Sequence, residues 1–326
     1  MMKARSWGVE GAARFATAPI MELIFEIEQY SIFHEMRLSS TAIQKNRQSH
    51  CASSNLYRPM LDTYSGATRV IFIVGDPIAQ VKSPASVTRA MRERGQDTVV
   101  VAAHVAPADL AEWTAAVRRM RNVDGIIVTV PHKFAALSLC SSLTPRARSI
   151  GAANVLRRDE AGGWHGDMCD GDGYIAGLRK AGCEPSDRRV LLVGAGGAGS
   201  AIAHALVDAG VAKLALHEAD TARREALADK LRRYGFASPE AGSDDPNGYD
   251  LVINATPMGM RPSDPLPIQV GRLGADCFVG DVVTVPAVTP LIEAARARGC
   301  GTMTGTGMFE AVCERMVDFY VEETVA

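Results

Sequence analysis

The stretch Val190 to Gly199, which reads VLLVGAGGAG, decides the fold class of this chain. Its apolar half predicts a buried strand, its glycine-rich half predicts a tight turn, and residues 200–209 predict a helix. Strand, G-x-G-x-x-G turn and helix in this order are the fingerprint of a dinucleotide-binding unit. The first glycine permits the turn, the second lets the backbone approach a pyrophosphate, and the third lets the helix pack on the strand. Free N–H groups at the helix N-terminus attract the phosphates.

Strands and helices alternate from residue 69 onward, which is typical of an α/β protein with parallel sheets covered by helices. We expect strands at 70–74, 98–104, 125–128, 190–193, 213–217, 251–254, 277–283 and 302–304, and a hairpin at 154–157 and 164–167. We expect helices at 84–94, 109–120, 134–143, 146–150, 173–181, 200–209, 222–234, 290–298 and 308–322.

Composition restricts the classes of function. The 326 residues suggest about two domains. A formal net charge of -2 and an isoelectric point near 6.4 provide no basic surface for nucleic acid or an anionic membrane. The seven cysteines are scattered without a CxxC pair, so we expect no metal site and a cytoplasmic protein with reduced thiols. No apolar run approaches the roughly 20 residues of a membrane-spanning helix. A homodimer is compatible with the sequence.

Residues 1–66 differ from the rest of the chain. They lack strand–helix alternation, and the polar stretch 44–55 has no periodicity, which argues for a loop or for disorder. Pro19, Glu22 and Glu26 interrupt the apolar residues, so a secretory signal is not expected. We therefore expect a dispensable leader, and Met60 is a sensible alternative start.

Seven separated strings share an order and spacing. They are 75–84 (GDPIAQVKSP), 129–133 (TVPHK), 151–154 (GAAN), 166–173 (GDMCDGDG), the glycine turn, 254–260 (NATPMGM) and 289–291 (TPL). Together they resemble the shikimate dehydrogenase family, which includes quinate-using relatives, and the resemblance covers residues 68–326. Enzymes of this family interconvert 3-dehydroshikimate and shikimate with a nicotinamide cofactor.

The resemblance implies two domains with the active site in a cleft between them. An α/β substrate domain would comprise 67–170 plus 307–326, and a Rossmann-type domain would comprise 171–306. Lys133 and Asp170 match the catalytic pair of the family. The family's substrate-binding residues match Ser83, Thr129 and Asn154. We assign cofactor binding to Gly194, Gly196, Gly197, Ala198, Gly199, Glu218, Asp220, Asn254, Thr256, Met258, Gly305 and Met308.

The chemistry of the residues agrees with a dehydrogenase. Hydride transfer to a ketone leaves an alkoxide, which must take a proton. A lysine can supply that proton, whereas an arginine remains charged. Only seven of the 35 basic residues are lysines, which makes Lys133 more informative. Asp170 would orient the ammonium, although it could instead be a turn residue within Asp170-Gly171-Asp172-Gly173. His132 is expected to be a bystander.

Several positions depart from the family's pattern. Val81 replaces a serine, Met168-Cys169 replaces Asn-Thr, Thr284 replaces a tyrosine and Val312 replaces a glutamine. Several of these positions hold the carboxylate and hydroxyls of shikimate in the family. We therefore expect an altered, more apolar pocket, and quinate, another cyclic polyol or a less polar hydroxy acid as substrate. A catalytically weak dinucleotide-binding regulator is the alternative.

The residues after the strand at 213–217 bear on the choice of cofactor. Glu218 and Asp220 lie about twenty residues past Gly199, where an acid binds the ribose 2′-hydroxyl of NAD and repels the 2′-phosphate of NADP. NADP-dependent relatives carry an arginine where this chain has Asp220. NAD is therefore favoured, and Arg223 and Arg224 keep NADP as the alternative.

Overall fold

The structure is a computed structural model that describes residues 64–322. The expectations for the leader therefore fall almost wholly outside the described residues. Within them, no helix is both long enough and apolar enough to cross a membrane.

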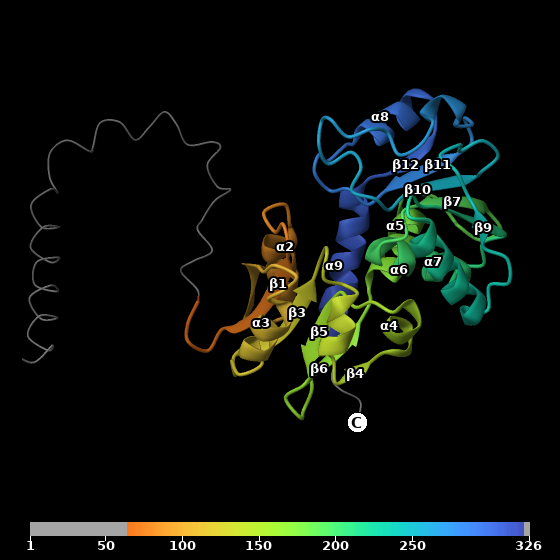
Figure 1. Cartoon of the computed structure of the whole chain (residues 1–326). Coiled ribbons are helices and arrows are strands. Elements are labelled where there is room, and N and C mark those ends of the chain that lie inside the picture. Colours follow the sequence, from red (N-terminus) through yellow and green to blue (C-terminus); the bar gives the residue numbers. More distant parts are fainter. Residues whose placement is uncertain (1–63, 323–326) are drawn as a thin grey trace, which may run out of the picture. The chain divides into compact units, whose positions relative to one another are not determined.

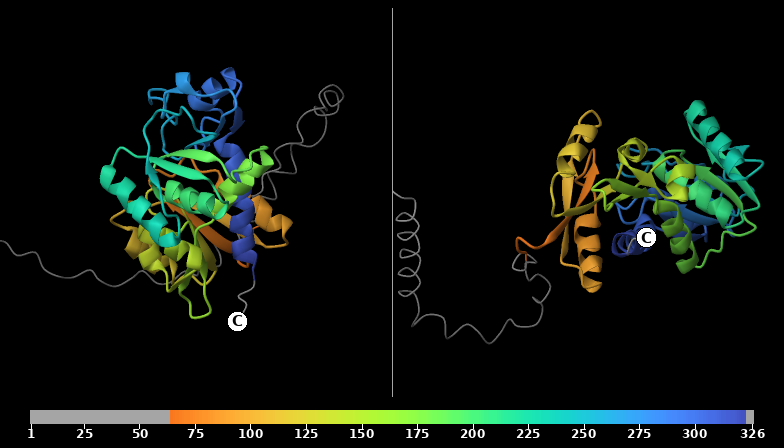
Figure 2. Two further views of the ribbon diagram at one scale, coloured as in Figure 1. Left: turned by 90° about the vertical axis from the view of Figure 1, so that its right-hand side faces the viewer. Right: turned by 90° about the horizontal axis from the view of Figure 1, so that it is seen from below.

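A six-stranded mixed sheet forms the first half of the described chain, in the order β2-β1-β3-β5-β6-β4 (Figure 1). Three of its strands are parallel neighbours: β1 (Arg69–Gly75), β2 (Thr98–His104) and β3 (Val123–Val128). The predicted hairpin is present as antiparallel β5 (Val155–Arg158) and β6 (Trp164–Asp167), and the short β4 (Ser142–Leu143) pairs with β6. The helices α2 (Ser83–Glu93) and α3 (Leu110–Val117) lie on opposite faces of this sheet (Figure 2).

A second six-stranded sheet has the order β12-β11-β10-β7-β8-β9, and all of its strand pairs are parallel. Its strands are β7 (Arg189–Val193), β8 (Lys213–His217), β9 (Glu240–Ala241), β10 (Leu251–Asn254), β11 (Phe278–Asp281) and β12 (Gly301–Met303). The helices α6 (Gly197–Asp208) and α7 (Thr221–Tyr234) share a core with Val190 and Leu192. On the other face, α8 (Pro290–Ala297) shares a core with Leu191 and Val193. Helices therefore cover both faces, as expected of a Rossmann-type sheet.

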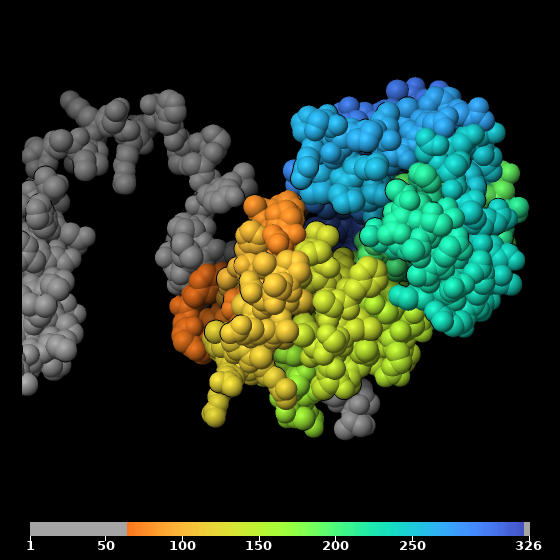
Figure 3. Space-filling view, viewed as in Figure 1, coloured from red at the N-terminus to blue at the C-terminus, as the bar shows by residue number. Residues whose placement is uncertain are grey.

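Two helices join the halves. α5 (Asp170–Lys180) leads from the first sheet to the second, and α9 (Gly305–Val321) returns from β12 to the first sheet, where the Arg157 guanidinium donates to the Phe319 carbonyl at 2.7 Å. Glycines let these helices approach closely: a Cβ on Gly173 would lie 2.4 Å from Val312 Cγ2. Figure 3 shows a hollow between the orange-to-lime half and the teal-to-blue half, which is the cleft expected between two domains.

The α/β class is confirmed, and three helix starts were predicted about three residues too late. α5, α6 and α9 begin at Asp170, Gly197 and Gly305 instead of 173, 200 and 308. Each first turn contains glycine, a poor helix former, which hid the start. Close packing explains the glycines, because a Cβ on Gly305 would lie 2.1 Å from the Val283 carbonyl oxygen.

The helix expected at 134–143 was wrong in its second half. Only 135–139 form a 3₁₀ turn, while Ser142 and Leu143 extend to pair with β6. Pro145 favours an extended residue before it, and Thr144 adopts φ −60° and ψ 154° as the N-cap of α4 (Pro145–Ile150). The helix α4 therefore begins at Pro145, and the residues before it are extended.

Candidate active site

A lysine, an aspartate and an asparagine meet where the first sheet leads into α5. The Lys133 ammonium donates to Asp170 Oδ2 at 2.5 Å, and the Asn154 amide donates to Asp170 Oδ1 at 2.7 Å. The side chains of Lys133 and Asp170 are only 16% and 6% exposed. Both carboxylate oxygens of Asp170 thus have a donor, and the ammonium has two further N–H groups to offer.

Lys133, Asn154 and Asp170 each lie next to the end of a strand or at the start of a helix. Lys133 follows β3 at its carboxyl end, and its carbonyl accepts from the Ala153 N–H at 2.9 Å. Asn154 immediately precedes β5, and its side-chain oxygen accepts from the Cys169 N–H at 2.8 Å. Asn154 is fully buried, and its bond to the N–H of Cys169 holds the residue that directly precedes α5.

Asp170 is the first residue of α5, and its carboxylate faces Lys133 and Asn154. The alternative of an isolated turn residue is therefore wrong. His132 is buried, and its Nε2 lies 2.8 Å from the Val105 carbonyl. This bond gives His132 a structural role, because it anchors the loop that carries Lys133.

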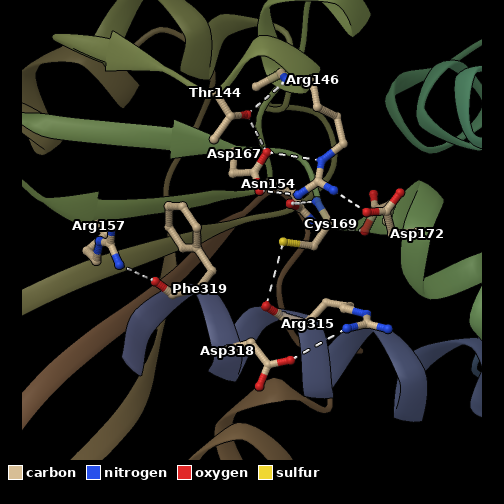
Figure 4. Close-up of polar contacts among 12 residues, drawn as sticks. Thr144, Arg146, Asn154, Arg157, Asp167, Cys169, Asp172, Arg315, Asp318 and Phe319 are labelled. Atoms are coloured by element: carbon tan, nitrogen blue, oxygen red, sulfur yellow. Dashed lines mark hydrogen bonds and ion pairs between the residues drawn. The ribbon is translucent and has the colours of Figure 1, made fainter. Parts of the chain in front are cut away.

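A second polar cluster, which was not expected from the sequence, holds the segment before α5 (Figure 4). The Arg146 guanidinium pairs with both Asp167 and Asp172, and Thr144 Oγ1 donates to Asp167 at 2.5 Å. The Asp167 carbonyl in turn accepts from the Asn154 N–H at 2.9 Å. The cluster braces the chain on both sides of Asp170. Asp167 and Asp172 stand in the string 166–173, but Thr144 and Arg146 lie outside the seven strings, so the sequence does not indicate the pairing.

Ser83 and Thr129 lie near the same edge of the first sheet. Ser83 opens α2 and is 4% exposed. Thr129 follows β3, its N–H donates to the Val74 carbonyl at 2.9 Å, and a Cβ on Gly75 would lie 2.4 Å from its methyl group. Ser83, at the start of α2, and Thr129, just after β3, therefore lie near the carboxyl edge of the first sheet, where Lys133 also lies.

The glycine turn has the geometry that a dinucleotide requires. Gly194 has φ +103°, which favours glycine. A Cβ on Gly199 would lie 2.1 Å from the Gly194 carbonyl oxygen, so the third glycine permits the helix to pack. A Cβ on Gly196 would meet nothing within 4 Å, which leaves open space beside the N-terminus of α6. This turn fits a bound pyrophosphate.

The turn and Lys133 are neighbours. A Cβ on Gly197 would lie 3.1 Å from both Cβ and Cδ of Lys133. The proton-bearing side chain from the first half of the chain thus passes beside the dinucleotide turn of the second half. This contact brings together two motifs that are about sixty residues apart in the sequence.

The acidic residues after β8 have different surroundings. Glu218 Oε2 accepts from the Ala195 N–H of the glycine turn at 2.9 Å, and its side chain is 12% exposed. Asp220 is the N-cap of α7 and accepts from the Arg223 N–H at 3.1 Å. The Arg223 guanidinium lies 3.7 Å from Glu218 and 3.6 Å from Asp220, whereas Arg224 pairs with Glu225. Glu218 is therefore the acid held against the turn.

The remaining residues assigned to the cofactor divide into surface and buried ones. Thr256 packs on the turn, 2.8 Å from the position of a Cβ on Gly194, and Met258 is 38% exposed. Asn254 is 1% exposed, and Gly305 and Met308 are buried in the start of α9. Asn254 uses both ends of its amide within the protein, with Thr256, Met258 and Asp281.

Comparison with known proteins agrees with this geometry. Residues 73–156 match the family model described as the shikimate dehydrogenase substrate binding domain. The chain is 38% identical over 246 residues to shikimate dehydrogenase (NADP(+)) of Acidiphilium cryptum, covering 75% of this chain and 87% of that one. It is 35% identical to the enzyme of the same name from Geobacter sulfurreducens, covering 79% and 92%.

The chain belongs to the shikimate dehydrogenase family. It is therefore an oxidoreductase of the CH–OH type that uses a nicotinamide dinucleotide. Among solved structures, a shikimate dehydrogenase in complex with NADP+ matches with a TM-score of 0.75 at 25% identity, over 81% of this chain and 93% of that one. Quinate dehydrogenase from Corynebacterium glutamicum in complex with NAD matches with a TM-score of 0.71 at 31% identity, over 78% and 94%.

The departures from the pattern of the shikimate dehydrogenase family fall into two groups. Met168, Cys169 and Val312 are each at most 3% exposed and belong to the packed core. Val81 and Thr284 are half-buried, and the Thr284 carbonyl accepts from the Lys82 ammonium at 2.8 Å. Of these positions, only Val81 and Thr284 keep exposed surface that could line a pocket.

Proposed function

We propose that this protein interconverts a ring ketone and a secondary alcohol of a small cyclic hydroxy acid of the shikimate or quinate type. The observation that carries the proposal is the buried Lys133–Asp170–Asn154 group beside the glycine turn. We assign substrate binding to 67–170 plus 307–326 and dinucleotide binding to 171–306. The bound nicotinamide would supply or accept the hydride.

The chain's own residues would manage the proton. Lys133 holds the proton at Nζ and passes it to the alkoxide oxygen during reduction, or receives it from the hydroxyl during oxidation. Asp170 keeps the ammonium in place with one oxygen, while Asn154 holds the other oxygen. Because Asp170 is nearly buried, this orientation is fixed before the substrate arrives.

Ser83 and Thr129 are our candidates for contact with the substrate, whereas Asn154 is fully buried, is bonded at both ends of its amide, and would act through Asp170. Ser83 and Thr129 present hydroxyls near the edge that carries Lys133, which suits a substrate rich in hydroxyl and carboxylate oxygens. Val81 and Thr284 would make the pocket less polar than in relatives that carry serine and tyrosine there. We therefore expect weaker binding of shikimate than of a less polar cyclic hydroxy acid.

For the cofactor we propose NAD over NADP. Glu218 is held against the glycine turn, where its carboxylate would accept from a ribose hydroxyl and repel a phosphate. The relatives include proteins named for NADP(+) and a solved quinate dehydrogenase with NAD, so both cofactors occur in the family. Arg223 is the group that would favour NADP.

The test is a steady-state assay of the full chain with shikimate and with quinate, each with NAD and with NADP. We expect turnover with at least one acid, a lower KM for NAD than for NADP, and a lower KM for shikimate in Val81→Ser. Turnover only with NADP would contradict the cofactor assignment. Tight dinucleotide binding without turnover of either acid would favour the regulator alternative.

A further inference from the structure

A buried aspartate at the end of β11 connects two loops near the dinucleotide turn. Asp281 is 0% exposed and lies beside Asn254 in the register of the parallel strands β10 and β11. Its carboxylate accepts from the Asn254 amide at 3.1 Å and from the Val283 N–H at 3.0 Å through Oδ1. Through Oδ2 it accepts from the Thr289 hydroxyl at 2.6 Å. A buried carboxylate is costly unless such donors surround it.

The bonds continue from Asn254 into the loop 255–260. The Asn254 side-chain oxygen accepts from the Thr256 hydroxyl at 2.6 Å and from the Thr256 N–H at 3.1 Å. Its amide also donates to the Met258 carbonyl at 3.1 Å. The start of this loop packs on the glycine turn, since a Cβ on Gly194 would lie 3.0 Å from the Ala255 carbonyl carbon. The loop is therefore held against the turn through Asn254.

The bonds continue in the other direction to α8. The Thr289 hydroxyl donates to Asp281 and accepts from the Ile292 N–H at 3.4 Å as the N-cap of α8. The Val283 N–H bond holds the start of the loop 282–289. Asp281 thus ties the loop after β10 and the loop after β11 to one carboxylate.

We propose that Asp281 is a positioning residue for the dinucleotide: its carboxylate holds the loops 255–260 and 282–289 in the shape that binds the cofactor. This inference rests on the proposed function only in taking the glycine turn as the dinucleotide site. Asn254 then acts on the cofactor through its loop, because its own polar groups are paired within the protein.

Protonation of Asp281 would weaken this arrangement. Burial raises the pKa of Asp281 to about 6, while the bonds from Thr289, Val283 and Asn254 oppose that rise. The titratable group that faces it from α5 is Tyr174, whose pKa burial raises well above 10, so it remains neutral. None of the ion pairs within residues 64–322 includes Asp281. Protonation would replace the charge-assisted bonds from Thr289, Val283 and Asn254 with weaker bonds to a neutral carboxyl group.

The test compares the full chain with Asp281→Asn by calorimetric titration of oxidised NAD and NADP between pH 5 and 7.5. The amide resembles the protonated carboxyl, so we expect about tenfold weaker binding than wild type at pH 7.5, the worth of one such bond. Wild-type affinity should fall as the pH drops through about 6, whereas that of the variant stays flat, and the two should converge at pH 5. Taking the ratio of the two proteins removes the titration of the ligand itself.

The matched control is Asp250→Asn, which removes a carboxylate at the opposite, amino end of β10, where it pairs with Arg189. It should leave dinucleotide affinity unchanged. If Asp281→Asn fails to fold, Thr289→Val should weaken binding in the same direction, and Thr289→Ser should restore it. Parallel pH profiles for wild type and Asp281→Asn, or equal affinities for Thr289→Val and wild type, would overturn the proposal. Because the readout is binding, inactivity toward shikimate and quinate would contradict the proposed function and leave this test intact.

Discussion

The chemistry of the site depends on how few of its polar atoms remain free. One carboxylate oxygen of Asp170 accepts from Lys133 and the other accepts from Asn154. The side-chain oxygen of Asn154 accepts from the Cys169 N–H. The Lys133 ammonium keeps two N–H groups after its bond to Asp170. In the proposed function, proton transfer therefore falls to Lys133, whose position the other two side chains fix.

Lys133→Met should lower kcat by about 10²–10⁴-fold, the usual worth of a general acid–base group. The stem of methionine keeps the contact beside Gly197, so the affinity for the dinucleotide should change little. Single-turnover rates and dinucleotide titration would measure the two effects separately. Lys213→Met, which loses only an exposed pair with Glu240, is the control. A kcat within a factor of three of wild type would remove Lys133 from the mechanism.

The residues after β8 are our candidates for setting the preference between NAD and NADP. Asp220 caps α7, so its replacement would cost about 1 kcal/mol of stability in addition to any effect on the cofactor. The cleaner change is Glu218→Ser with Ala219→Arg, which removes the acid at the turn and adds a guanidinium at an exposed position. NADP binding should tighten by about 1–3 kcal/mol, the scale of charge-assisted bonds. The ratio of kcat/KM for the two cofactors measures the change, and an unaltered ratio would show that neither position faces the ribose.

At the scale of elements, the roles of the glycines explain why the turn could be predicted and why the starts of three helices could not. The spacing of Gly194, Gly196 and Gly199 predicted the turn, because each of these glycines is needed for the turn or for the packing of the helix that follows it. The glycines at the starts of α5 and α9 are required by close contacts with residues distant in sequence, such as Val312 and the Val283 carbonyl. Sequence alone could not reveal those partners, so the helices were predicted too short.

The same limit applies to the polar clusters. Lys133 and Asp170 could be predicted because each stands in a recognisable string. Arg146 and Asp281 stand outside the strings used, and their partners come from other elements. Their importance follows from burial and pairing, which only the three-dimensional structure supplies.

Two alanine substitutions in the glycine turn should differ in their effects: Gly199→Ala should lower stability, whereas Gly196→Ala should lower dinucleotide affinity. Gly199→Ala places a Cβ 2.1 Å from the Gly194 carbonyl oxygen, so we expect a loss of roughly 1–3 kcal/mol in stability from the forced shift. Gly196→Ala meets nothing within 4 Å and has φ −72°, so stability should be preserved. Dinucleotide affinity should nevertheless fall in Gly196→Ala, because the new methyl occupies the space open to the pyrophosphate. Thermal unfolding and titration measure both, and normal affinity in Gly196→Ala would move the pyrophosphate elsewhere.

At the scale of the whole molecule, every residue assigned to the site lies between Ser83 and Met308. We therefore expect a shortened protein that starts at Met60 to retain its melting temperature within about 2 °C and its kcat/KM within a factor of two. These limits correspond to less than about 1 kcal/mol. Thermal unfolding and steady-state kinetics of the two lengths would check it. A shortened protein that is insoluble, or that loses activity, would assign a role to residues 1–59.

Two lysines, Lys82 and Lys230, each form a hydrogen bond between the two halves of the described chain. The Lys82 ammonium, just before α2, donates to the Thr284 carbonyl at 2.8 Å beyond β11. The Lys230 ammonium on α7 donates to the Ile150 carbonyl at 3.0 Å at the end of α4. Each bond joins one half of the described chain to the other, so these lysines help to set the separation of the two halves.

Lys82→Met keeps the length of the side chain and removes the bond to the Thr284 carbonyl. A hydrogen bond from a charged donor contributes about 1.5–3 kcal/mol, and half-burial reduces that figure through solvent screening. We expect the melting temperature to fall by about 2–4 °C, the shift that about 1 kcal/mol gives for a chain of this size. We also expect kcat to fall while the dinucleotide affinity stays constant, because the turn is intact but the halves no longer hold substrate and cofactor at a fixed separation. Lys213→Met serves again as control, since its pair lies within one half. An unchanged kcat in Lys82→Met would mean that the bond from Lys82 to Thr284 does not set the separation of the two halves.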